Sequence, residues 1–229
     1  MKDNIINFIE FECSDNFQHD IYHAYKIILH ELHDEYQYIY QIWNYIPNIN
    51  ENYTKFNLGR KLAFENKYSL YPVSTCVSNT VDNLISIYYE IGKNIPLILN
   101  NPRQTPPEYY PKKYGTPPVF SRAAIVDNKL RISGTASIIG STTIHPGDIQ
   151  HQTQETLLNI EAIIEQANKC REDILNPMDL SYTVYLKNRE NSDIVFNLLK
   201  DTCGGHNIEI EEADMCREDL LIEIEAYEI

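Results

Sequence analysis

The sequence predicts an α+β fold built from two similar units whose sheets pack together with helices on the outer faces. The first observation is a repeat: each half reads as strands, a long helix, a strand, a short helix and two further strands. The second is a stretch at 94–118 that holds seven of the eleven prolines and separates the halves. A sheet with helices on one face needs a partner for its other face, so we expect the units to bury these faces against each other.

Each element of the first half follows from hydrophobic spacing. An apolar run at 5–11 predicts a strand, and apolar residues spaced along 21–32 predict a helix. The remaining elements are a strand at 38–47, a short helix at 53–64, and strands at 73–77 and 84–91.

The second half repeats this order. Its expected elements are strands at 120–126 and 130–139, a helix at 152–173, a strand at 180–186, a helix at 194–200, and strands at 207–212 and 220–227. We therefore expect a shortened first unit at 1–93, a proline-rich connector at 94–117 and a second unit at 118–229. Because proline fixes φ, the connector should be extended and stiff; it either lines a site or is merely a structural crossover.

Charge is distributed unevenly along the chain. The formal net charge is −14, yet residues 60–131 contain ten basic and five acidic side chains. A local excess of cations favours capture of a small anion, although a solvated connecting loop would have the same composition. The net charge argues against nucleic-acid binding and against anionic membranes.

Cysteine and histidine usage argues against disulfide and metal sites. The five cysteines are scattered with no C-x-x-C pair. His19 and His23 have helical i, i+4 spacing, but with no cysteine nearby they indicate a polar helix face rather than a metal site. The N-terminus lacks the pattern of a signal peptide and no apolar run is long enough to span a bilayer, so we expect a cytoplasmic protein.

Several motifs carry a family resemblance. The segment MCREDLLIEIEAY resembles the closing strand of the YjgF/RidA imine-deaminase fold. A larger set, in order and spacing, resembles the chorismatases over roughly residues 38–229: WNYIPNIN at 43–50, FNLGRKLAF at 56–64, NPRQ at 101–104, YPKKYG at 110–115, PVFSRA at 118–123, SGTASIIG at 133–140, HPGD at 145–148 and QTQETLLNI at 152–160. The stretch TPPEYYP after the PRQ element departs from the family.

The resemblance implies an activity. Chorismatases contain two YjgF-like halves in one chain and remove pyruvate from chorismate without a cofactor. The alternative is a YjgF/RidA-like imine deaminase or a non-catalytic protein that binds a small metabolite. Related folds are trimeric, but an internally duplicated chain fills part of that interface itself, so a monomer is expected.

The candidate substrate-binding residues lie within the family-like motifs. Arg60, Arg103 and Arg122 would pair with the two carboxylates of chorismate, because guanidinium binds carboxylate in bidentate geometry. For each arginine the alternative is an ion pair with a protein carboxylate. Tyr114 would donate a phenolic hydrogen bond, unless it only packs.

Three further positions join this set. Gly134 and Thr135 would let the backbone approach the ligand, with a β-bulge as the alternative. Glu155, near the start of the long helix, is either part of the site or a helix-dipole partner.

Glu223 is the candidate general acid. Vinyl-ether cleavage needs an acid that stays protonated near neutral pH, and burial raises the pKa of a carboxyl. An acidic face on this strand would otherwise be solvent-facing. The family match places the acid at Glu223 and leaves Glu225 a structural role.

Two residues bear on the product. Cys216 precedes Glu223 by seven residues, and a cysteine here is typical of chorismatases that form 3-hydroxybenzoate, alone or together with 4-hydroxybenzoate. Its alternative is a small buried hydrophobe. Ala136 is instead typical of the branch that forms the dihydroxycyclohexadiene carboxylate. We give the cysteine more weight, because it lies beside the acid and affects where water can sit.

Overall fold

The computed structural model describes the whole chain except residues 1–3, 34–35 and 66–69. The first unit contains one mixed sheet, with strand order β1-β4-β2-β3, and two helices. Its elements are β1 (Ile5–Glu12), α1 (Phe17–His30), β2 (Tyr38–Ile46), α2 (Ile49–Phe64), β3 (Val73–Ser78) and β4 (Leu84–Gly92).

The second unit contains a larger sheet with strand order β11-β10-β12-β7-β6-β5, and again two long helices. Its elements are β5 (Leu97–Leu99), β6 (Ala123–Val126), β7 (Lys129–Ala136), α3 (Ile149–Asn168), β10 (Leu180–Leu186), α4 (Ser192–Cys203), β11 (Ile208–Glu212) and β12 (Ile222–Glu228). A two-stranded hairpin, β8 (Ile138–Ile139) and β9 (Thr142–Thr143), stands beside this sheet.

The two sheets share one topology. In the first, β2 pairs in parallel with β3 and antiparallel with β4, which pairs antiparallel with β1. In the second, β10 pairs in parallel with β11 and antiparallel with β12, which pairs antiparallel with β7. This equivalence confirms the predicted duplication. The pair β5–β6 has no counterpart among the described strands of the first sheet.

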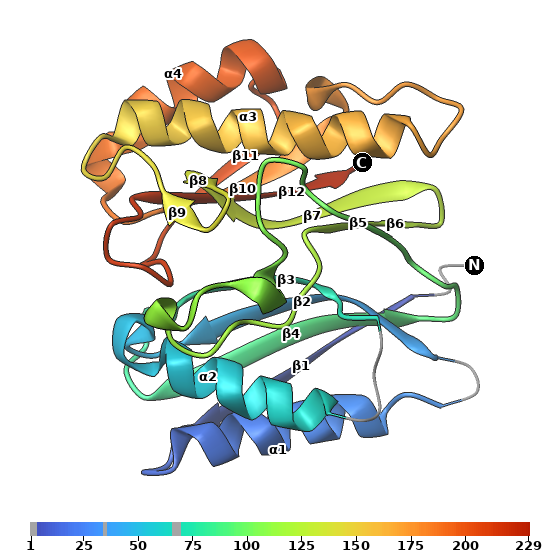
Figure 1. Cartoon of the computed structure of the whole chain (residues 1–229), viewed down its shortest axis with the longest axis vertical. Helices are drawn as coiled ribbons and strands as arrows, with labels where there is room; N and C mark the ends of the chain where they lie inside the picture. Colours follow the sequence, from blue (N-terminus) through green and yellow to red (C-terminus); the bar gives the residue numbers. More distant parts are fainter. Residues whose placement is uncertain (1–3, 34–35, 66–69) are drawn as a thin grey trace.

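The four layers are helices, sheet, sheet, helices (Figure 1). One hydrophobic core lies between α1, α2 and the first sheet, and another between α3, α4 and the second sheet. The inner sheet faces are joined by polar contacts, such as the 2.6 Å ion pair between Arg131 on β7 and Glu90 on β4. The predicted outer position of the helices is therefore confirmed.

Several element boundaries differ from expectation. The helix expected at 53–64 begins at Ile49, directly after Asn48, which has a left-handed backbone conformation. The helix expected at 152–173 spans Ile149–Asn168, and the strand expected at 130–139 divides into β7 and β8. The expected connector is not uniformly extended, because Leu97–Leu99 joins the second sheet and two 3-10 turns follow it (Pro107–Tyr109 and Lys112–Tyr114). The division of the chain at 94 and 118 stays a prediction.

Within the described residues, no helix has both the length and the apolar character needed to cross a membrane.

Candidate active site

A cavity of about 330 Å³ lies where the two sheets meet, a volume suited to a small metabolite. The first unit contributes Tyr53 and Arg60 from α2 and Cys76 from β3; the second contributes Gly134 and Ala136 from β7 and Glu223 from β12. Most of the other lining residues come from the segment before β6 and the loop before β12: Tyr110, Pro111, Lys113, Gly115, Thr116, Pro117, Pro118, Phe120, Arg122, Cys216, Arg217 and Leu220. Thr54, Ser74 and Ile138 also line the cavity.

Arg60 is 2% exposed, although its guanidinium faces the cavity. One of its terminal nitrogens donates to Ser74 Oγ at 3.2 Å and the other to Asn57 Oδ1 at 2.9 Å. The guanidinium carbon lies 4.8 Å from the ring centre of Phe56, and Nε has no hydrogen-bond partner. Neutral groups therefore hold this cation in place.

Arg122, which also lines the cavity, is held in a similar way. It donates to the Tyr110 hydroxyl, and its guanidinium carbon lies 5.6 Å from the Tyr110 ring centre and 5.1 Å from that of Phe120. Its Nε is buried without a hydrogen-bond partner. Aromatic faces stabilise the cation without neutralising it.

Across the part of the chain that the structure describes, no ion pair includes Arg60 or Arg122. Buried charge without a partner is costly, so two such groups in one cavity indicate a site for an anionic ligand. The fork of each guanidinium suits a carboxylate.

Glu223 faces these cations from the middle of the second sheet. Alternation along β12 places Ile222, Ile224 and Ala226 in the helix-facing core and turns Glu223 and Glu225 toward the first sheet. The Glu223 side chain fits only because position 134 lacks a side chain: a Cβ added to Gly134 would lie 2.0 Å from Glu223 Oε1. Gly134 therefore allows the acid to approach the backbone, and it also lines the cavity that a ligand would enter.

The environment of Glu223 keeps it protonated. Burial raises its pKa to about 8, the nearby charge of Glu225 adds to the rise, and the Arg122 cation opposes it. A carboxyl with this pKa is mostly neutral at pH 7 and can donate a proton inside the cavity.

Cys216 and Ala136 both lie near Glu223. Ala136 is its cross-strand neighbour on β7, and both residues line the cavity. Burial raises the pKa of the Cys216 thiol to about 12, with a smaller contribution from Glu223. The thiol is therefore neutral near pH 7, with little thiolate character.

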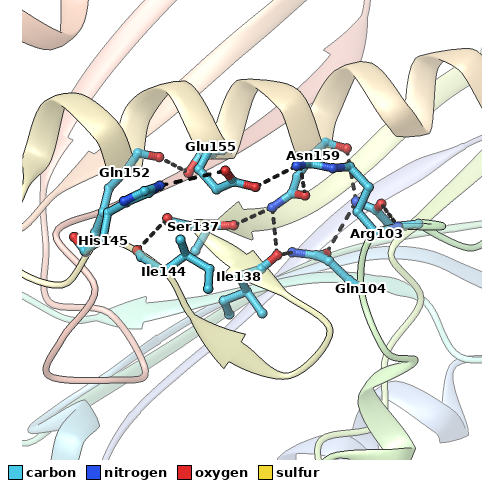
Figure 2. A network of polar contacts seen from close by, with 12 residues as sticks. Arg103, Gln104, Ser137, Ile138, Ile144, His145, Gln152, Glu155 and Asn159 are labelled. Carbon is cyan, nitrogen blue, oxygen red and sulfur yellow. Dashed lines mark hydrogen bonds and ion pairs between the residues drawn. The ribbon is translucent and has the colours of Figure 1, made fainter.

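Three predicted residues do not line the cavity. Arg103 pairs with Glu155 at 2.8 Å and donates to Asn159 at 3.0 Å beneath α3, as Figure 2 shows. Thr135 is fully buried and donates to the carbonyl of Ser133.

Arg103, Glu155 and Thr135 lie on the other face of the second sheet, the face against which α3 packs, and therefore do not reach the cavity. Asn159 donates to the carbonyls of Ala136 and Ile138, two residues that line the cavity, so this network supports its wall from behind (Figure 2). The side chain of Tyr114 lies outside the described part of the structure.

Residues that the sequence analysis did not single out complete the site. Tyr110 and Phe120 flank Arg122, and Arg217 lies 5.2 Å from the Tyr110 ring centre. The sequence indicates these residues through their neighbours: Tyr110 and Phe120 belong to the quoted motifs, and Arg217 directly follows Cys216. No group of three or more histidine, cysteine or carboxylate side chains suited to a metal ion occurs among the described residues, and His19 and His23 lie together on the exposed face of α1.

Comparison with known proteins identifies the family. A 3-hydroxybenzoate synthase from Streptomyces hygroscopicus is 30% identical over 228 residues, which cover 88% of this chain and 67% of that protein. The chain belongs to the chorismatase family. A chorismatase from Streptomyces rapamycinicus is 28% identical over 205 residues, covering 80% of this chain and 61% of the relative.

Similarity to the chorismatases extends over the whole chain. The family described as Chorismatase FkbO/Hyg5-like, N-terminal, matches residues 2–89, and a chorismatase crystal structure superposes with a TM-score of 0.90 at 25% identity, covering 99% of this chain and 75% of that structure. The resemblance expected over 38–229 therefore also includes the residues before 38. The chain spans 61–67% of the length of the two curated relatives named above.

Proposed function

We propose that the chain is an enzyme that binds chorismate and releases pyruvate by protonating its enolpyruvyl ether. One observation carries the proposal: a buried carboxyl with a raised pKa, Glu223, faces the same cavity as two buried arginines that form no ion pair with any described residue. Chorismate is a dianion with a vinyl ether that is sensitive to acid. Arg60 and Arg122 bind its two carboxylates, and Glu223 is the acid.

The reaction proceeds from the proton of Glu223. Its transfer to the enolpyruvyl methylene forms a C–H bond and leaves an oxocarbenium ion and the Glu223 carboxylate. The bond between the ring and the ether oxygen then breaks, its electrons form the carbonyl of pyruvate, and the ring hydroxyl oxygen closes onto the same ring carbon. The hydroxyl proton returns to Glu223, and the arene oxide rearranges to 3-hydroxybenzoate. Water attack on the oxocarbenium ion would give the diol instead.

Pyruvate release tests the proposal directly. Purified protein is incubated with chorismate, and pyruvate is measured with lactate dehydrogenase. Release well above the spontaneous rate is expected, whereas release at the spontaneous rate would overturn the proposal. A non-catalytic binding protein is not favoured, because a protein that only binds a metabolite needs no shielded acid. An imine deaminase is not favoured, because the relatives named above are a 3-hydroxybenzoate synthase and a chorismatase.

The product is proposed to be 3-hydroxybenzoate, in line with the name of the Streptomyces hygroscopicus relative. Cys216 lines the cavity beside Glu223, where its bulk limits the room for a water molecule. For Cys216→Ala we predict a larger share of the diol, because the smaller side chain admits water, with pyruvate release retained. Chromatography of products from wild type and variant checks this. A wild-type reaction yielding only the diol would contradict the branch assignment but not the pyruvate-releasing activity.

We propose a monomer that works in the cytoplasm. The inner faces of the two sheets meet within one chain, as in the contacts of Glu225 with Trp43 and Thr75, so a large sheet interface is already satisfied. Light scattering should give a mass near 26.7 kDa, and three times that value would indicate a trimer.

A further inference from the structure

Glu225 is a second buried carboxyl on the same strand and the same face as Glu223. It is 4% exposed, and two residues of i, i+2 spacing on a strand lie about 6.6 Å apart along the chain. The chemistry proposed for Glu223 assigns no task to Glu225. Burial of a carboxyl costs free energy unless hydrogen bonds compensate it, so the hydrogen-bond partners of Glu225 need to be identified.

The first unit supplies two hydrogen bonds to Glu225, and Thr183 on β10 of the second unit supplies another. The indole nitrogen of Trp43 on β2 donates to Oε1 at 2.9 Å, and the hydroxyl of Thr75 on β3 bonds Oε2 at 2.5 Å. Thr75 also accepts a hydrogen bond from the backbone N–H of Gly134 at 3.0 Å, which leaves its proton to be donated to Glu225. An indole N–H can only donate, so each carboxyl oxygen receives a donor.

This arrangement distinguishes the two carboxyls. Donors on both oxygens stabilise the ionised form of Glu225. For Glu223, the influences on the pKa are burial, Glu225 and Arg122, with no hydrogen bond among them. Burial raises the pKa of Glu225 to about 7, and the hydrogen bonds from Thr75 and Trp43 oppose this rise. Of the coupled pair, Glu225 therefore loses its proton first.

We propose that Glu225, held between Trp43 and Thr75, is a positioning residue whose negative charge keeps Glu223 protonated and so sets the upper pH limit of catalysis. The inference rests on the proposed acid role of Glu223. It also gives the contact between the two units a function, because the first unit fixes the charge that tunes an acid belonging to the second.

Other titratable and polar groups also face Glu223 and Glu225. Those around Glu223 are Arg60 and Tyr53 on α2, Cys76 on β3, Arg122 before β6 and Cys216 before β12. Those around Glu225 are Tyr45 on β2, Thr183 and Tyr185 on β10, and Glu211 on β11. Arg122 favours the ionised form of Glu223 and Glu211 disfavours that of Glu225, so both oppose the proposed order; the two donors on Glu225 outweigh them.

The single tryptophan of the chain gives a readout that does not depend on activity. Trp43 donates to Glu225, so its fluorescence should change with pH as Glu225 titrates, with a midpoint between about pH 6 and 8. Glu225→Gln should abolish this transition. Glu223→Gln should leave its midpoint nearly unchanged, because Glu223 is still neutral while Glu225 ionises.

Three outcomes of the titration would overturn the proposal. These are the absence of a transition in the wild type, its persistence in Glu225→Gln, and a fall of its midpoint by a full unit in Glu223→Gln. The last would mean that Glu223 ionises first. Thr75→Val is the second variant should Glu225→Gln fail to fold, and it should raise the midpoint because one donor to the carboxylate is lost.

The pH profile of pyruvate release tests the catalytic part. The acid must be protonated, so kcat/KM should fall as pH rises through the pKa of Glu223. Glu225→Gln removes a like charge and should move this fall to lower pH by about one unit or more. Glu209→Gln is the matched control, an exposed glutamate on the inner face of β11, and should leave the midpoint in place.

The two assays separate the possible failures. An unmoved midpoint in Glu225→Gln would overturn the inference, since a purely structural role lowers the rate without shifting its pH dependence. If the wild type releases no pyruvate, the proposed function fails, and the Trp43 titration alone still decides whether Glu225 ionises before Glu223.

Discussion

At the scale of single residues, the surroundings of a charged group decide what it does. Arg103 and Arg122 belong to similar family-like motifs, yet Arg103 pairs with Glu155 while Arg122 lies between two aromatic rings. A carboxylate partner compensates the charge of Arg103, whereas the aromatic rings around Arg122 leave its charge uncompensated, as the proposed binding of a substrate carboxylate requires. The same reasoning separates Glu223 from Glu225.

Glu223→Gln should abolish turnover while the protein still folds. The amide keeps the shape and polarity of the carboxyl but cannot deliver a proton, and general acids typically contribute about 10²–10⁴-fold. Pyruvate release and thermal unfolding, measured on the same preparation, check both parts. Activity within about twofold of wild type would show that the acid lies elsewhere.

Arg122→Ala should lower kcat/KM by about 10²-fold or more, because a substrate carboxylate would lose a charge-assisted pair inside a buried site. Arg122→Lys should recover only part, since lysine keeps the charge but not the bidentate geometry. The comparison is Arg103→Ala, which removes a cation that does not line the cavity. For Arg103→Ala, the loss in free energy of unfolding should exceed the loss in transition-state stabilisation calculated from kcat/KM. The reverse ranking would indicate that Arg103 binds the substrate.

These residue roles could be predicted from sequence only in part. The strand pattern and the motif point to Glu223, and five other residues that the sequence singles out also line the cavity: Arg60, Arg122, Gly134, Ala136 and Cys216. The ion pair of Arg103 with Glu155 joins residues 52 positions apart, and nothing in a single sequence shows that contact. Likewise, alternation cannot tell a buried acidic face from a solvent-facing one, because that depends on what the sheet packs against.

At the scale of elements, the pairing of β7 with β12 determines where the Glu223 carboxyl lies. The register between them shifts between Ile224 and Ala226, opposite the segment that contains Gly134, so the expected alternative of a β-bulge is present. The irregularity and the missing side chain together make room for the Glu223 carboxyl. Regular elements were predictable because their apolar spacing is strong, whereas the hairpin β8–β9 was not, since two-residue strands carry no periodicity.

Gly134→Ala should reduce both stability and turnover, because its Cβ would lie 2.0 Å from Glu223 Oε1 and 3.1 Å from Thr75 Cγ2. Adding Glu223→Ala removes the nearer of these atoms. The double variant should therefore lose less stability than the sum of the two single variants, a coupling of about 1 kcal/mol or more for residues in contact. Urea unfolding of all four proteins measures it, and strictly additive losses would mean that the backbone relaxes to avoid the clash.

At the scale of the whole molecule, the two buried carboxyls make the free energy of unfolding depend on pH. Burial raises the pKa of Glu223 to about 8 and that of Glu225 to about 7, both above the ordinary value of 4.5. Between these limits the folded state binds more protons than the unfolded state, so stability falls as pH rises. Both carboxyls lie between the two units, so the loss acts where the units are joined.

Replacing both carboxyls should therefore flatten the pH dependence. We predict that Glu223→Gln combined with Glu225→Gln makes the free energy of unfolding at pH 8.5 larger than in the wild type, by on the order of a few kcal/mol, with a much smaller difference at pH 5. The carboxyl of Glu228, whose pKa its Arg171 partner lowers, acts in the opposite sense and favours the folded state above the ordinary carboxyl range in both proteins. Urea midpoints from pH 5 to 8.5 give the comparison. Parallel curves would mean that the two carboxyls titrate alike in the folded and unfolded states, and that neither the acid role of Glu223 nor its control by Glu225 has the required electrostatic basis.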